Sequence, residues 1–264
     1  MKFKSKTIWI TGASSGIGRA MALAFSKQGA NLIVSARNVE KLNDVKKECQ
    51  DPNRVEVLPL DLINYSSFNE KTATALAFFD GIDILINSGG ISQRALAKDT
   101  ALTVDRSIFE TNFFGTIGLT KALLPHFISK KSGQIVVISS VVGKIGTPLR
   151  SSYSGSKHAL HGFFDSLRAE LYDDNITVTL ICPGFVNTNV SLNALTGDGS
   201  KQNKLDKATA KGLSPDDFAK IALRAIAHKR QEIVIGGFKE KLAVYVKRFF
   251  PLLLANIIRK AKVT

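Results

Sequence analysis

The stretch TIWITGASSGIGR, residues 7–19, decides the fold because a short apolar run ends directly in a glycine-rich turn that opens a helical pattern. Gly12, Gly16 and Gly18 give the spacing G-x-x-x-G-x-G. A nucleotide site needs such a turn for backbone room, for close approach of main-chain N–H groups to phosphate, and for a helix N-terminus that attracts anions. Tight strand-to-helix turns occur in α/β proteins generally, and the position after the first strand favours the nucleotide site.

Six further segments repeat the short apolar pattern of the first. Each is rich in Ile and Val and is closed by Gly, Pro or polar residues, which is typical of strands. The nearly continuous apolar runs predict a parallel sheet covered on both faces, and helical patterns alternate with the strands. We therefore expect an α/β, single-domain Rossmann fold over residues 1–264, with a doubly wound, seven-stranded parallel sheet. The expected strands lie at residues 7–12, 31–37, 54–61, 82–90, 133–140, 176–184 and 232–237.

Length and composition exclude several classes of protein. The chain has 264 residues, 44% of them hydrophobic and 22% charged, as expected for one globular domain. Cys49 and Cys182 stand far apart and outside any C-x-x-C motif, so we expect neither a disulfide framework nor a metal site. The pI near 9.8 comes without a nucleic-acid recognition module, so we expect no nucleic-acid partner.

The apolar runs also bear on where the protein works. The basic N-terminus is followed by an apolar run that stops at the glycine turn, unlike a secretion signal. No uninterrupted apolar run reaches the roughly 18 residues that are needed to span a bilayer. We therefore expect a cytoplasmic protein.

The end of the second strand bears on which dinucleotide would bind. At that point an acidic residue holds the ribose 2'-hydroxyl of NAD, whereas an arginine accommodates the 2'-phosphate of NADP. This strand ends in SARN, so Arg37 stands there and its guanidinium favours NADP(H); a solvated arginine at a helix start is the alternative. Asp61 and Asn87 close the third and fourth strands, where they either face the cofactor or form turns.

Tyr153 and Lys157, in SSYSGSKHAL at residues 151–160, are four residues apart and so share one helix face. A tyrosine pKa lies near 10, and a nearby ammonium with an oxidised nicotinamide favours the phenolate, which makes Tyr153 a usable proton donor. Ser140 ends the fifth strand, where its hydroxyl could bond a substrate carbonyl. Taken singly, Ser140 fits a helix cap and Tyr153 a half-buried aromatic. Jointly, beside a nucleotide loop, they favour catalysis.

The motifs TGASSGIG, NSGG, NFFG, YSGSK and PGFVNT occur in the order seen in short-chain dehydrogenases/reductases, and the chain resembles this family over nearly its whole length. The resemblance implies hydride transfer between NAD(P) and a carbonyl or alcohol. It implies Tyr153 as acid/base, Lys157 as its ribose-binding and pKa-lowering partner, and Ser140 as the substrate-polarising hydroxyl. Asn112 resembles the family's helix-kinking asparagine, which holds a relay water. The implied cofactor site comprises Gly12, Ser14, Ser15, Gly16, Ile17, Gly18, Arg37, Asp61, Leu62, Asn87, Tyr153, Lys157, Pro183, Val186 and Thr188.

Within that resemblance, Asp61 is similar to the adenine contact and Thr188 to the contact with the nicotinamide carboxamide. The family usually has N-A-G where this chain has NSGG, and because serine is also small we expect the site to be retained. The segments GLTKALLPHF, RSSYSGSKHALHGFFDSLRAEL and PGFVNTNVSLNALTGDGS look closer still to the branch related to 11-beta-hydroxysteroid dehydrogenase. Members of that branch generally prefer NADP(H), in agreement with Arg37.

Two further segments bear on the substrate and on a membrane contact. Residues 186–213 are irregular in pattern, and we expect them to close over the substrate as a lid. Leu192 and Leu195 in this segment favour an apolar, lipid-like substrate or pack against the core. The basic C-terminal extension, residues 239–264, interleaves Lys and Arg with Phe, Tyr and Leu. It fits a helix resting on an anionic membrane, a cover over the cleft, or a contact with a second subunit.

These observations together predict an NADP-dependent short-chain dehydrogenase/reductase (EC 1.1.1.-) that acts on a small-molecule carbonyl or secondary alcohol. We expect a homodimer or homotetramer, with peripheral membrane contact through the basic C-terminus. The alternative function is a non-catalytic NADP(H)-sensing protein. The joint presence of Ser140, Tyr153 and Lys157 favours the enzyme, because a sensor has no physical need for a proton donor beside the nicotinamide.

Overall fold

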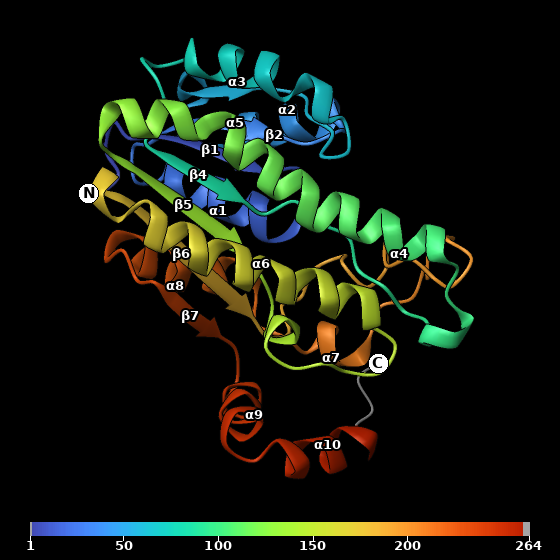
Figure 1. Cartoon of the computed structure of the whole chain (residues 1–264). Coiled ribbons are helices and arrows are strands. Elements are labelled where there is room, and N and C mark those ends of the chain that lie inside the picture. The colour runs from blue at the N-terminus through green and yellow to red at the C-terminus, as the bar shows by residue number, and fades with distance from the viewer. Residues whose placement is uncertain (1, 261–264) are drawn as a thin grey trace.

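The computed structural model describes residues 2–260 and shows a sheet of seven parallel strands with helices on both faces (Figure 1). The strand order β3-β2-β1-β4-β5-β6-β7 is that of a doubly wound sheet, so the expected fold is confirmed. Met1 and the last four residues of the expected C-terminal extension, 261–264, lie outside the described residues. The strands are β1 (Thr7–Thr11), β2 (Asn31–Ser35), β3 (Val55–Val57), β4 (Ile84–Asn87), β5 (Gly133–Ile138), β6 (Ile176–Pro183) and β7 (Glu232–Ile235).

Helices connect the successive strands. The α-helices are α1 (Gly16–Ser26), α2 (Val39–Glu48), α3 (Phe68–Leu76), α4 (Leu102–Phe109), α5 (Gly115–Lys130), α6 (Ser151–Glu170), α7 (Lys207–Ala210), α8 (Pro215–Ala227), α9 (Phe238–Phe249) and α10 (Pro251–Lys260). Short 3-10 turns occupy η1 (Pro52–Arg54), η2 (Tyr65–Ser67), η3 (Ala97–Asp99), η5 (Val141–Gly143) and η6 (Tyr172–Asp174), and η4 (Glu110–Phe114) is π-helical.

Strand β3 is one of several strands that are shorter than their sequence patterns. The pattern RVEVLPLD suggests residues 54–61, whereas β3 ends at Val57. Pro59 has no backbone N–H to donate to a ladder, which limits regular pairing at this edge strand. The chain still follows β2 beyond that point, because the Leu60 N–H donates to the Ala36 carbonyl at 3.1 Å.

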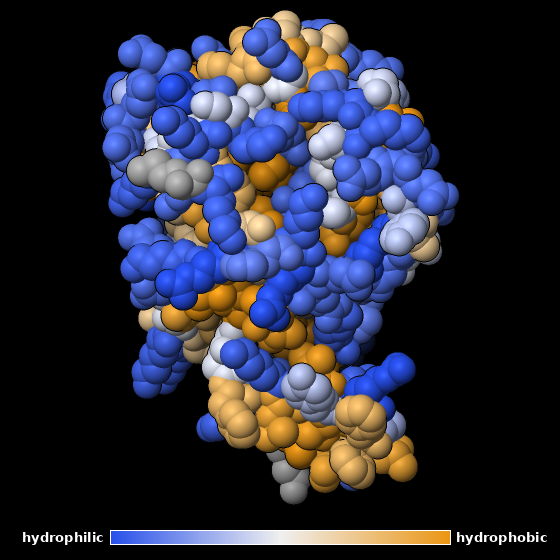
Figure 2. Space-filling view, turned by 90° about the vertical axis from the view of Figure 1, so that its left-hand side faces the viewer, coloured by the Kyte–Doolittle hydropathy of each residue, from blue (hydrophilic) through white to orange (hydrophobic). Residues whose placement is uncertain are grey.

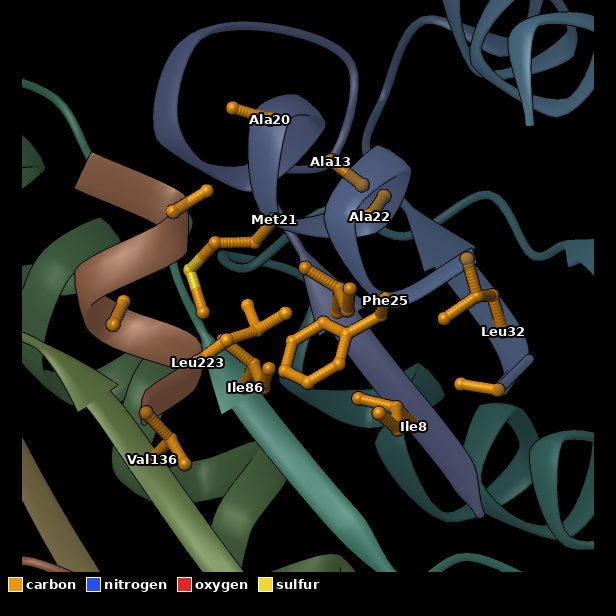
Figure 3. Packing of buried hydrophobic residues seen from close by; sticks show 14 of the residues in the cluster. Ile8, Ala13, Ala20, Met21, Ala22, Phe25, Leu32, Ile86, Val136 and Leu223 are labelled. Atoms are coloured by element: carbon orange, nitrogen blue, oxygen red, sulfur yellow. The ribbon is translucent and has the colours of Figure 1, made fainter. Parts of the chain in front are cut away.

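The core consists of two apolar layers, one on each face of the sheet. Alternate residues of β1 point to opposite faces, so Ile8 and Ile10 belong to one layer and Trp9 to the other. Figure 3 shows the first layer, in which Met21 and Phe25 of α1 pack over the sheet near Ile86 of β4. The second layer lies beneath α3, α5 and α6 and includes Phe68, Phe127 and Phe164. Burial on both faces explains the continuous apolar runs of the strands.

The parallel arrangement brings the carboxyl ends of all strands to one edge of the sheet. The strand order reverses between β1 and β4, and ligands of open α/β sheets bind outside that switch point. At the far edge of the sheet, α9 and α10 follow β7 and extend away from the body (Figure 1). None of the helices within residues 2–260 combines the length and the apolar character that crossing a bilayer requires.

Candidate active site

The turn between β1 and α1 accepts only glycine at its key positions. Gly12 has a φ of +65°, and a Cβ there would lie 2.7 Å from the Gly89 Cα. A Cβ on Gly18 would lie 2.4 Å from the Gly12 carbonyl oxygen. Gly16 has a φ of +55°, in the left-handed region that favours glycine. The backbone of this turn is therefore exposed to close approach at the N-terminus of α1, with Ser14, Ser15 and Ile17 on the same turn.

The ends of β2 and β3 bring further residues to the same edge. The Ala13 N–H donates to the Ser35 carbonyl at 3.1 Å, which ties the glycine turn to the end of β2. Arg37 follows two residues later and is exposed, without an ion pair among residues 2–260. Asp61 is half-buried and accepts a hydrogen bond from the Ile63 N–H at 3.2 Å, while Leu62 is buried against Gly89.

Asn87 is the last residue of β4 and is 3% exposed. Its Nδ2 donates to the Thr120 Oγ1 at 3.0 Å, whereas its Oδ1 has no hydrogen-bond partner among residues 2–260. A buried acceptor without a partner is costly, so the Asn87 Oδ1 is suited to receive a donor from a ligand. The glycine turn, the free Arg37 head and this acceptor all fit a dinucleotide at the switch point of the sheet.

Asn112 lies in the π-helical segment η4, between α4 and α5, and is fully buried. Its Oδ1 accepts from the Ile91 N–H at 2.8 Å, and its Nδ2 donates to the Ile91 carbonyl at 2.9 Å and to the Ser156 Oγ at 3.1 Å. The π-helical segment therefore places the Asn112 side chain where it bonds to both the loop after β4 and helix α6. Asn112 fixes the distance between these two parts of the site.

Ser140, Tyr153 and Lys157 meet at the carboxyl edge of β5. Ser140 follows β5, and its Oγ accepts from the Val142 N–H at 3.3 Å. Lys157 is buried on α6, donates from Nζ to the Ile138 carbonyl at 2.8 Å, and holds Nζ 5.9 Å from the centre of the Tyr153 ring. Burial lowers the pKa of Lys157 to about 8. The sequence-predicted set is thus brought together in space.

Opposing effects act on the pKa of Tyr153, which as a residue is half-buried. Burial raises its pKa, while a hydrogen bond with Ser140 and the positive charges of Arg150 and Arg94 lower it. The sequence predicted that the charge of Lys157 lowers the pKa of Tyr153, and it did not indicate that Arg150 and Arg94 act on this pKa. The run RSSY places Arg150 three residues before Tyr153 and could have signalled it, but no local pattern connects Arg94 with the site.

The segment after β6 covers the glycine turn. Pro183 ends β6, Val186 is buried, and the Thr188 Cγ2 lies 3.2 Å from the position that a Cβ on Gly16 would take. Thr188 therefore lies beside the N-terminus of α1, whereas Pro183 lies near Ser140, whose Oγ donates to the Pro183 carbonyl at 3.5 Å. Farther along, the Leu195 N–H donates to the Ser92 carbonyl at 2.8 Å, so the segment 186–213 is anchored to the loop after β4.

One group of side chains within residues 2–260 has residue types found in metal sites: His161, Cys182 and Glu232. The His161 Nε2 lies 3.7 Å from the Cys182 Sγ, whereas its Nδ1 faces Glu232 at 3.4 Å. One ligand atom of each residue lies within 4.8 Å of the others, but the imidazole presents a different nitrogen to each partner. Burial also raises the pKa of Cys182 to about 12, which keeps the thiol protonated. We propose no metal here.

The buried Lys157 yields a stability prediction for the cofactor-free protein. We expect Lys157→Met to raise the free energy of unfolding near pH 7, by up to about 3 kcal/mol. The folded-state pKa is about 8 and the ordinary value is 10.5. Between these values the unfolded chain binds more protons, so wild-type stability rises with pH and the advantage of the variant shrinks. Thermal unfolding from about pH 7 to pH 10 measures this trend.

The exposed Lys121→Met on α5 is the control, because removal of a solvated ammonium should give no such trend. A difference between Lys157→Met and wild type that stays constant over the whole pH range would contradict the assignment.

Comparisons with known proteins agree with this geometry. The family model described as short chain dehydrogenase matches residues 6–198. The Drosophila melanogaster "Dehydrogenase/reductase SDR family protein 7-like" is 44% identical over 263 residues, covering 98% of this chain and 81% of that protein.

Two solved structures are similar over most of the chain. The closed form of serine dehydrogenase complexed with NADP+ has a TM-score of 0.80 and 26% identity, covering 88% of this chain and 95% of that one. A Burkholderia phymatum short chain dehydrogenase/reductase in complex with NAD has a TM-score of 0.84 at 22% identity, covers 96% of both chains, and at that identity shows the fold alone. From the family match and the Drosophila relative, the chain belongs to the short-chain dehydrogenase family of oxidoreductases.

Proposed function

We propose that this protein transfers a hydride between NADP(H) and a carbonyl compound or secondary alcohol. The observation that carries the proposal is the convergence of Ser140, Tyr153 and Lys157 beside the glycine turn at the switch point of the sheet. The nicotinamide, when bound, supplies or accepts the hydride. The protein's own groups have to orient the substrate oxygen and move one proton.

Each side chain has one task in the proposed reaction. The Ser140 hydroxyl donates to the carbonyl oxygen and stabilises the charge that develops on it. The Tyr153 hydroxyl gives its proton to that oxygen in reduction, and takes it back in oxidation. Lys157 is held near the Tyr153 ring, where its ammonium would hold the cofactor ribose. Asn112 keeps the loop after β4 against α6 and would hold the water that returns a proton to Tyr153.

The proposed cofactor site uses the ends of successive strands. The glycine turn would hold the pyrophosphate through its N–H groups and the N-terminus of α1. Asp61 and Leu62 would border the adenine, and Asn87 would accept a hydrogen bond. Pro183, Val186 and Thr188 would border the nicotinamide. The choice of NADP(H) rests on Arg37, whose exposed guanidinium suits the 2'-phosphate. An NADP+ complex of a similar structure supports a phosphorylated cofactor, and an NAD complex of another shows that the fold accepts either.

The anchored segment 186–213 is our proposed substrate lid within a single NAD(P)-binding domain. Leu192 and Leu195 are half-buried in it, which supports an apolar or lipid-like substrate. Closing this segment over the cleft would exclude water from the hydride step. We further propose a homodimer or homotetramer in the cytoplasm. The alternative function, a non-catalytic NADP(H) sensor, shares the cofactor site and lacks turnover.

The C-terminal arm, which we define as α9 and α10, supports a peripheral membrane contact. It presents bulky apolar side chains to solvent, among them Tyr245 at 66%, Phe249 at 68% and Leu252 at 82% exposure. Figure 2 shows hydrophobic residues gathered on the extension at the bottom of the molecule. Lys239, Lys241, Lys247, Arg248 and Arg259 are exposed on the same arm. Basic groups beside an apolar face suit a surface of anionic lipid.

The function is tested by NADPH consumption across a panel of steroids, retinoids, keto-acyl thioesters, quinones and small aldehydes. With a substrate found, we expect Tyr153→Phe to lower kcat by about 100-fold or more, because the proton donor is lost. NADPH affinity should stay within a few-fold of the parent. Tyr172→Phe, at an 83% exposed tyrosine, is the control and should keep the parent rate. NADPH binding without turnover of any panel member would favour the sensor.

The cofactor assignment is tested by Arg37→Ala. Loss of charge-assisted hydrogen bonds to the 2'-phosphate should weaken NADPH binding about 10-fold to 100-fold, while NADH binding should change little. Fluorescence titration of both cofactors measures the two affinities, and the exposed Arg230→Ala is the control. Equal affinities of the parent protein for the two cofactors, left unchanged by the substitution, would refute the assignment.

The membrane contact is tested by co-sedimentation with vesicles. We expect the protein to bind vesicles of phosphatidylcholine with phosphatidylserine at low salt, and pure phosphatidylcholine far less. The double change Lys247→Ala and Arg248→Ala should weaken binding roughly 30-fold, at about 1 kcal/mol per basic side chain. Lys98→Ala with Lys121→Ala, two exposed lysines outside the arm, form the control. Dimerisation through the arm without vesicle binding would overturn the proposal.

A further inference from the structure

Three segments distant in sequence meet through buried ionic groups beside the site. Arg94 from the loop after β4 is 9% exposed, Arg150 before α6 is 4% exposed, and Asp206 before α7 is 2% exposed. The Asp206 Oδ2 lies 2.8 Å from the Arg94 Nε, 2.7 Å from its Nη2, and 3.4 Å from the Arg150 Nη2. One carboxylate therefore contacts two guanidinium groups in the interior.

Neighbouring groups hold this cluster in a fixed geometry. The second carboxylate oxygen of Asp206 accepts a hydrogen bond from the Gln202 Nε2 at 3.1 Å. The backbone N–H of Asp206 donates to the Ser191 Oγ at 3.2 Å. The Arg94 Nη1 donates to the Ser92 Oγ at 2.8 Å. Buried charges are expensive to desolvate, and a buried ion pair is weak evidence of added stability. The cluster is therefore better explained by the effect of its charges on neighbouring groups than by a contribution to stability.

The surroundings include the tyrosine of the proposed reaction. Arg150 directly precedes α6 and lies three residues before Tyr153. The residues on either side of Arg94 bond to this part of the chain: the Gln93 Oε1 accepts from the Ser152 N–H at 2.9 Å, and the Ala95 N–H donates to the Leu149 carbonyl at 3.1 Å. The buried cluster therefore lies against the first turn of α6, which bears Tyr153. Arg150 and Arg94 lower the pKa of Tyr153 against the effect of burial. Burial lowers the pKa of Arg150 itself to about 10, with Arg94 adding to the effect, and Asp206 opposes it. Asp206 thus helps to keep Arg150 charged.

We propose that Arg150, held by Asp206 beside Arg94, is a positioning residue that stabilises the phenolate form of Tyr153 and so sets the pH range in which that tyrosine exchanges its proton. The proposal rests on the proposed function for its catalytic meaning, but the electrostatic effect exists without turnover. Asp206 belongs to the segment 186–213, so the same contacts fix the proposed lid beside the tyrosine.

The sign of the effect depends on all charged groups around Tyr153. Arg150 directly precedes α6, Lys157 lies on α6, and the loop after β4 adds Arg94. Asp206 comes from the segment 186–213, and Asp105 on α4 accepts a hydrogen bond from the Ser152 hydroxyl. Removal of the Arg150 charge leaves Asp206 paired with Arg94 and takes away one cation near the phenol. The phenolate then becomes less stable, and Tyr153 titrates at higher pH.

The test follows Tyr153 directly by NMR of protein labelled with ¹³Cζ-tyrosine, titrated up to alkaline pH. The chain has four tyrosines, and the Tyr153→Phe variant assigns the signal. In Arg150→Gln the onset of the Tyr153 titration should move upward by about one pH unit. Arg150→Lys keeps the charge and should restore an onset near that of the parent. Arg106→Gln, on the exposed side of α4, is the matched control and should leave the onset unchanged.

Near-UV circular dichroism at neutral pH confirms that each variant is folded, and Arg150→Met replaces Arg150→Gln if the glutamine variant is not. A Tyr153 titration that is the same in the neutral variants, the lysine variant and the parent would overturn the proposal. Because no turnover is measured, this result is independent of whether the protein proves to be an oxidoreductase or a sensor. In an active enzyme, the pH profile of kcat should shift in the same direction as the NMR titration.

Discussion

The close approach of the glycine turn to the end of β4 constrains the whole site. A Cβ on Gly12 would lie 2.7 Å from the Gly89 Cα, and a Cβ on Gly89 would lie 2.6 Å from the Leu62 Cδ1. The main chain of the loop after β1 therefore contacts the main chain of the loop after β4 at the switch point of the sheet. The loop after β3 packs closely against the same point. Asn112 then links the loop after β4 to α6 through Ile91 and Ser156. The position of Tyr153 relative to the glycine turn follows from these contacts.

The same edge concentrates charge that a purely structural core would avoid. Lys157, Arg94 and Arg150 are all at least nine-tenths buried there. Desolvation lowers the pKa of Lys157 to about 8 and that of Arg150 to about 10, so both cations are held at a cost to the folded state. Asp206 forms an ion pair with both arginines. The positive charge of these groups suits the proposed phenolate of Tyr153 and the proposed anionic cofactor.

The sequence predicts what depends on local pattern and fails where distant segments meet. All seven strands and the glycine turn were predictable, because Ile-Val runs closed by Gly or Pro report burial and turning within a few residues. The NFFG motif identified Asn112 as a site residue. The hydrogen bonds between Asn112 and Ile91 depend on a π-helical turn, which the pattern of apolar residues in the sequence does not indicate. Arg94 and Asp206 are 112 residues apart, and nothing near either residue indicates the other. Their pairing follows from the topology, which brings the loop after β4 beneath the segment 186–213.

The attachment of the C-terminal arm connects its proposed surface with the proposed chemistry. Leu254 of α10 is 4% exposed, although most bulky side chains of the arm face solvent. It packs with Val141, which directly follows Ser140, and with Ile145, which lies just beyond the same turn. The arm therefore rests on the turn that positions the Ser140 hydroxyl rather than on an unrelated part of the surface. A lipid surface that fixed the arm would therefore also restrain the turn that follows Ser140 in the proposed active site.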